Sequence, residues 1–113
     1  MLARITSSRH GETELVTAAG ELDLASAATF RQALREATTA GGAGSRVVVD
    51  LGDVELLDSV SLGMLLGARR RVLERNGLLR IVADTPGVLR TFELTGTTDL
   101  FELVRTLDEA LDG

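Results

Sequence analysis

Residues 47–67 decide the fold of this chain, and they read VVVDLGDVELLDSVSLGMLLG. The first part, Val47 to Val49, is β-branched and continuously apolar, which is typical of a central strand buried on both faces. We therefore predict a strand over residues 46–51. A shorter apolar piece follows over residues 54–57, after a glycine and an aspartate.

A helix is predicted over residues 60–75, because apolar side chains there recur at spacings of three and four. Ser59 stands directly before this helix. We predict that Ser59 is the N-cap, since its hydroxyl can accept a hydrogen bond from the free N–H groups of the first turn. Ser61 is a second candidate for this role. Asn76 and Gly77 end the helix, with the glycine predicted in a left-handed conformation.

Strands and helices alternate on both sides of this segment. Apolar, β-branched runs predict the strands, and apolar stripes at helical spacing predict the helices. In chain order, the further predicted elements are a hairpin of strands over 3–7 and 12–18 that turns at 9–11; a helix with the stripe Ala27, Phe30, Leu34 and Ala37; a glycine-rich loop over 40–45; a strand over 78–83; a helix capped by Thr85, begun by Pro86 and stopped by Gly96; a strand over 101–104; and a helix over 106–111.

This order of elements predicts an α/β fold. Strands joined by helices form right-handed crossovers, so the sheet is expected to be mostly parallel, with the initial hairpin making it mixed. We expect four to five strands packed against about four helices. The length of 113 residues suits a single domain over residues 1–113, with one core.

The composition excludes several classes of function. A net charge of -5 argues against a nucleic-acid partner, which would require a basic face. There is no cysteine and a single histidine, His10, which excludes disulfides and metal sites built from cysteine or several histidines. All 12 basic residues are arginine. Residues 1–5 lack the apolar core of a signal peptide, and no run is long enough to span a membrane. We expect a cytoplasmic protein without membrane insertion or a cofactor of its own.

No catalytic constellation accompanies Ser59. The only histidine lies in a predicted distant turn, so a Ser-His-Asp hydrolase is excluded. Asp50 ends an apolar strand, as the phosphoacceptor of a response-regulator receiver does. A receiver also needs a lysine and an acidic pair, which this chain lacks. We therefore expect a binding protein rather than an enzyme.

Two motifs link the chain to a known family. Residues 20–23 read GELD, and residues 57–63 read LDSVSLG. They resemble the G-E-L-D and D-S-[ST]-G-L-G motifs of the STAS domain, the fold of bacterial anti-sigma factor antagonists. Residues 80–96 are similar to a later strand and helix of that family, and the order of elements agrees over nearly the whole chain.

The resemblance implies a phosphorylation switch in bacterial transcription regulation. By position, Ser59 is the phosphorylated serine. The partner is then an anti-sigma factor that is also a serine kinase, and the ATP and magnesium belong to that kinase. A metal-dependent serine phosphatase then removes the phosphate from the serine. The unphosphorylated form binds the anti-sigma factor and releases the sigma factor, and Asp23 lines the binding face.

The sequence departs from the family motif at two positions. Val60 replaces a small hydroxyl residue, and Ser61 replaces the signature glycine, where extra bulk is expected to meet an approaching kinase loop. Ser61 is an alternative phosphorylation site. These departures leave open a non-switching STAS scaffold, or a subunit of a stress-signalling or lipid-transport complex. The predicted partner-binding residues are Asp23, Asp58, Ser59, Val60, Ser61, Leu62 and Met64. The arginines at 69–71 are interpreted as a solvated helical face near the helix C-terminus.

Overall fold

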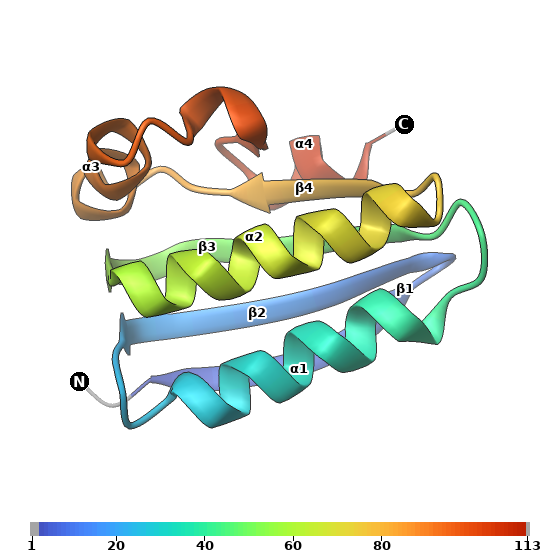
Figure 1. The fold of residues 1–113 in the computed structure, drawn as a ribbon, viewed down its shortest axis with the longest axis horizontal. Coiled ribbons are helices and arrows are strands. Elements are labelled where there is room, and N and C mark those ends of the chain that lie inside the picture. The colour runs from blue at the N-terminus through green and yellow to red at the C-terminus, as the bar shows by residue number, and fades with distance from the viewer. Residues whose placement is uncertain (1–2, 113) are drawn as a thin grey trace.

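A five-stranded sheet forms the centre of the computed structural model, which describes residues 3–112 (Figure 1). The strands lie in the order β1-β2-β3-β4-β5, with β1 antiparallel to β2 and the other pairs parallel. The predicted fold class is confirmed, with five strands and four α-helices in the described residues. The elements are β1 Arg4–His10, β2 Thr13–Leu22, α1 Ala27–Ala40, β3 Arg46–Leu57, α2 Ser59–Glu74, β4 Leu78–Val82, α3 Pro86–Leu94, a 3-10 turn Thr98–Leu100, β5 Glu102–Val104 and α4 Leu107–Leu111.

Strand β3 is longer than the sequence predicted. The two apolar pieces form one continuous strand, because the backbone stays extended through Gly52 and Asp53. The N–H of Gly52 donates to Oδ1 of Asp50 over 2.9 Å, and the β2–β3 ladder shifts register near this point. The irregularity is absorbed locally, so pairing continues to Leu22 and Leu57.

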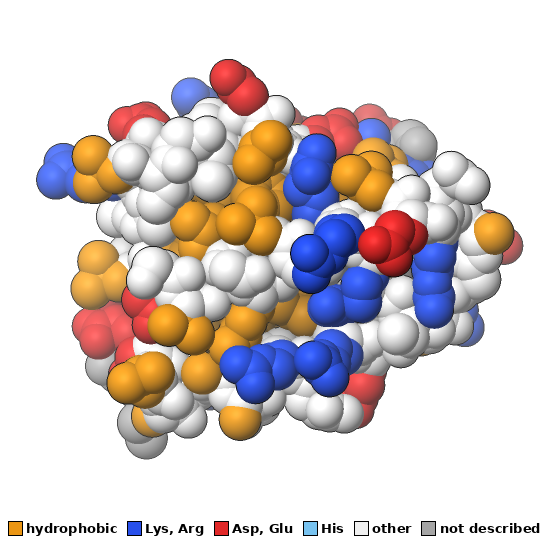
Figure 2. Space-filling model, viewed as in Figure 1, with side chains coloured by type: hydrophobic (Ala, Val, Ile, Leu, Met, Phe, Trp, Pro, Cys, Tyr) orange, Lys and Arg blue, Asp and Glu red, His pale blue; other side chains and the backbone are white. Residues whose placement is uncertain are grey.

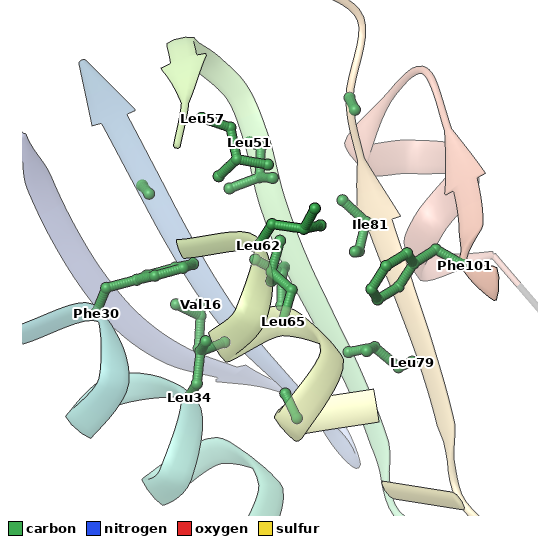
Figure 3. Packing of buried hydrophobic residues seen from close by; sticks show 14 of the residues in the cluster. Val16, Phe30, Leu34, Leu51, Leu57, Leu62, Leu65, Leu79, Ile81 and Phe101 are labelled. Carbon is green, nitrogen blue, oxygen red and sulfur yellow. The ribbon is translucent and has the colours of Figure 1, made fainter. Parts of the chain in front are cut away.

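Both faces of the sheet carry apolar side chains. The main cluster lies under α1, α2 and α3, and a smaller one of Leu15, Val48, Val82 and Ala110 lies under α4. Figure 3 shows Phe30 and Leu34 of α1 and Leu65 of α2 pointing toward the sheet. Such burial supplies the main driving force for folding and fixes the helices on the sheet.

The turn after α2 differs from the prediction. Asn76, with φ 58°, holds the left-handed conformation that was assigned to Gly77. Asparagine tolerates this region better than most residues. Gly77 is needed for a different reason: a Cβ there would collide with the backbone oxygen of Ser45.

Helix α3 secures the end of β3. The β3–β4 ladder stops at Asp50, so the carbonyls beyond it need other donors. The Thr85 hydroxyl donates to the Val54 oxygen over 2.8 Å, and the Thr91 hydroxyl donates to the Leu57 oxygen over 2.9 Å. Thr85 occupies the N-cap position of α3, as predicted, but makes no side-chain cap hydrogen bond, whereas Pro86 begins the helix as predicted.

We predict that Thr91→Val lowers the free energy of unfolding by about 1–2 kcal/mol, because the part-buried Leu57 carbonyl loses its donor. Urea denaturation measures this change. Thr29→Val is the control, since Thr29 is an exposed helical threonine whose replacement is expected to change stability by less than about 0.5 kcal/mol. Equal unfolding midpoints for the two variants would contradict the role given to Thr91.

Candidate partner-binding site

The parallel pairing of β2 with β3 brings the two sequence motifs together. Leu22 and Leu57 are ladder partners and are the last residues of their strands. Asp23 and Asp58 follow them directly, so both aspartates lie at the same edge of the sheet. Figure 1 shows the ends of β2 and β3, the start of α2 and helix α3 at this end of the molecule.

Asp58, and not Ser59, is the N-cap of α2. Its Oδ1 accepts a hydrogen bond from the Ser61 N–H over 2.7 Å. The prediction that Ser59 caps the helix is wrong because β3 stays extended through Leu57, which leaves Asp58 as the residue between strand and helix. Aspartate and serine are both favoured caps, so their order at the boundary decides which one is used.

Ser59 is the first residue of α2, and it is exposed. The first intrahelical hydrogen bond runs from the Leu62 N–H to the Asp58 oxygen, so the N–H groups of Ser59 and Val60 have no acceptor within the helix. Together with the helix dipole, these groups favour negative charge at this position.

Ser61 and Leu62 face the interior. Ser61 is 1% exposed, its Oγ has no hydrogen-bond partner, and Leu62 is 4% exposed within the main core. Neither side chain can contact a partner in this structure, which corrects their assignment to the binding surface. The bulk that Ser61 adds in place of the signature glycine also lies in the interior and not on the molecular surface.

Val60 and Met64 remain available on the outside of α2. Val60 is 43% exposed, and Met64 is partly buried against the core. The core side of α2 is formed by the residues at 61, 62, 65, 68 and 72. Val60 and Met64 lie on a different side of the helix, next to α1.

Three exposed leucines around this edge were missed by the sequence analysis. Leu24 is 78% exposed, Leu56 is 55% exposed and Leu94 is 80% exposed. Leu24 follows Asp23, and Leu94 lies one helical turn after Thr91, which is bonded to Leu57. With Val60, these leucines form what we call the apolar rim. Contiguous exposed apolar patches mark interaction sites, and these four side chains are candidates for such a patch. Figure 2 shows orange hydrophobic side chains on the face and end of the molecule where α2 begins.

Asp23 organises the turn that leads into α1. Its Oδ1 accepts from the N–H groups of Ala25 and Ser26 over 3.0 and 3.3 Å, and its own N–H donates to the Ser26 hydroxyl over 3.1 Å. The residue is exposed and lies beside the start of α2. It therefore shapes the loop next to Ser59 and presents negative charge there.

No other chemistry is built at this edge within residues 3–112. No group of three or more His, Asp or Glu side chains in these residues could hold a metal ion. None of the helices in the same range has the length and apolar character needed to cross a bilayer. What the described residues present at this edge is the exposed Ser59 hydroxyl, next to Asp58 and beside the loop of Asp23.

Comparison with known proteins agrees with this arrangement. A family profile described as "Mlab, STAS domain" matches residues 5–105. The chain therefore belongs to the STAS domain family, and the predicted membership is confirmed.

The relatives within this family are anti-sigma factor antagonists. The anti-sigma-B factor antagonist of Bacillus subtilis is 30% identical over 78% of this chain and 78% of its own length. The anti-sigma-F factor antagonist RsfB of Mycobacterium tuberculosis is 30% identical over 96% of this chain and 87% of its own. The crystal structure of an anti-sigma factor antagonist from Mycobacterium paratuberculosis superposes with a TM-score of 0.86 at 30% identity, covering 97% of this chain and 92% of that one.

The corrected cap leads to a testable difference between adjacent residues. We predict that Asp58→Ala lowers the free energy of unfolding by about 0.5–2 kcal/mol, whereas Ser59→Ala changes it by less than about 0.5 kcal/mol. Thermal or urea unfolding, followed by circular dichroism, compares the two. A larger loss for Ser59→Ala than for Asp58→Ala would restore Ser59 as the cap.

Proposed function

We propose that this STAS domain is an anti-sigma factor antagonist whose binding is switched off by phosphorylation of Ser59. The proposal is carried by the exposed Ser59 hydroxyl at the first position of α2, between Asp58 and the exposed Val60 and beside the loop that holds Asp23. The partner is an anti-sigma factor with ATP-dependent serine kinase activity, and a serine phosphatase reverses the modification. In this reading the domain is a binding partner and not itself an enzyme.

Ser59 accommodates a phosphate without disturbing the fold. The phosphate brings about -1.5 to -2 charges at neutral pH. At an exposed helix N-terminus such charge is favourable by about 0.3–1 kcal/mol. No buried contact has to be broken, since the Ser59 side chain takes no part in the cap.

The same phosphate opposes binding of a fitted partner. In the complex the apolar rim is covered, and the phosphate is removed from water beside two carboxylates. Desolvating a multiply charged group is expensive unless cationic groups receive it, and the like charges of Asp23 and Asp58 increase the penalty. The unphosphorylated hydroxyl carries no such penalty, so the modification state decides whether the complex forms.

Ser61 is the less favourable target. Its Oγ is buried in the helix start, and a kinase could reach it only after α2 unwinds locally. We therefore assign the switch to Ser59 alone.

Incubation with an anti-sigma factor kinase of the source organism and magnesium-ATP tests the modification. We expect intact-mass analysis to show one added phosphate, site mapping to place it on Ser59, and Ser59→Ala to abolish it. Ser61→Ala is the matched control and should be phosphorylated like the wild type. A phosphate on Ser61, or none with any such kinase, would contradict the assignment and favour a non-switching STAS scaffold.

Binding measurements test the switch itself. We expect Ser59→Asp to weaken affinity for the anti-sigma factor by about tenfold or more, and phosphorylated wild type to be weaker still, because a carboxylate carries less charge than phosphate. Ser59→Ala should bind like the unmodified wild type and remain bound in the presence of magnesium-ATP. Isothermal titration calorimetry gives the affinities. Equal affinity for phosphorylated and unphosphorylated protein would show that Ser59 is no switch.

A further inference from the structure

A groove of about 360 Å³ runs between α1 and α2, starting next to the site described above. The two helices are parallel, since each returns antiparallel to its own strand of a parallel pair. The groove is lined by Arg31, Leu34 and Arg35 from α1, and by Val60, Gly63, Met64, Gly67 and Arg71 from α2. Figure 2 shows blue and orange side chains next to one another on the face that these helices cover.

The arginines of the groove lack carboxylate partners. Within residues 3–112, the ion pairs join Arg9 to Glu14 and Arg80 to Glu102, and neither involves the groove. Arg71 is held in place because its Nε donates to the Thr38 hydroxyl of α1 over 2.9 Å. Partial burial and the nearby charges of Arg35 and Arg70 lower the pKa of the Arg71 guanidinium, against the opposing charge of Glu74. Positive charge is thus concentrated here in a chain with a net charge of -5.

Between the arginines, the groove is lined by Val60, Met64 and two glycines of α2. Met64 is partly buried, Val60 is partly exposed, and both glycines are inside a helix, where glycine is less favourable than alanine. A Cβ on Gly63 would meet no atom within 4 Å, and one on Gly67 would make only an ordinary contact with Arg71. The protein's own packing therefore does not require a glycine at either position.

We propose that this groove receives an acidic segment of the anti-sigma factor, with apolar side chains on Val60 and Met64 and carboxylates on the arginines. Arg31 and Arg35 are one helical turn apart, about 6 Å along the axis. Positive charge spread over three arginines of two parallel helices fits a chain segment better than a single compact anion, which binds where donors converge on one point.

The groove also connects the partner surface to the switch. Val60 lines the groove and follows Ser59 directly. A phosphate on Ser59 lies at the end of the groove next to Val60. There it repels the carboxylates of an incoming segment, and it partly neutralises the positive charge of the arginines that attracts them. This inference rests on the proposed function, and it adds a surface that extends about three helical turns beyond Ser59, as far as Arg71.

Affinity for the anti-sigma factor that phosphorylates Ser59 tests the groove. Arg31→Glu/Arg35→Glu reverses two exposed charges that make no hydrogen bond or ion pair in the described residues. Gly67→Leu fills the groove while improving helix propensity. Arg105→Glu, on an exposed loop after the opposite edge strand, is the matched charge control. Circular dichroism and thermal unfolding check that each variant is folded.

We expect the double arginine variant and Gly67→Leu each to bind about tenfold or more weakly, with Arg105→Glu within about twofold of the wild type. Raising salt from about 50 mM to about 500 mM should weaken the wild type more than the double variant. The two folded groove variants could bind with wild-type affinity while Ser59→Asp binds weakly. This result would overturn the proposed role of the groove and leave the proposed function standing. An anti-sigma factor that does not bind the wild type at all would remove the proposed function and this inference with it.

Discussion

The parallel pairing of β2 with β3 is the constraint on which the rest of the structure depends. It continues to Leu22 and Leu57 through two register shifts, one between Thr17 and Ala19 and one between Gly20 and Glu21. Because both strands end in register, two segments far apart in the sequence deliver their aspartates to one edge. The same pairing sets α1 and α2 parallel to each other. The loop geometry, the exposed Ser59 and the arginine-lined groove all follow from this one ladder.

The order and type of the elements could be predicted from the sequence because each segment carries a clear period. The site could be predicted in part. Asp23, Asp58 and Ser59 are adjacent to strand ends, and strand ends in a parallel sheet share an edge. The cap could not be assigned, because Asp58 and Ser59 are both good caps and the choice depended on where β3 ends.

The sequence also did not predict which side of α2 packs against the core, and the reason is different. The apolar residues of this helix are not gathered on one side, so its sequence does not distinguish Leu62, which is in the core, from Met64, which lines the groove beside α1. The exposed leucines of the apolar rim were missed because an apolar residue is assigned to the core by default. Thr85 and Thr91 hold α3 against the end of β3, and only this position of the helix shows that Leu94 lies outside the core.

The two departures from the family motif are opposite in kind. Ser61 adds a Cβ and a hydroxyl oxygen to the interior, whereas the Val60 side chain lies on the exposed surface. A comparison of the motif sequences alone would treat the substitutions at residues 60 and 61 as equivalent. In the folded protein, the buried Ser61 bears on the stability of the fold, whereas the exposed Val60 bears on the surface that is open to contact. Of the two substitutions, only Val60 therefore alters the exposed surface at the start of α2, whereas the side chain that replaces the signature glycine is hidden from it.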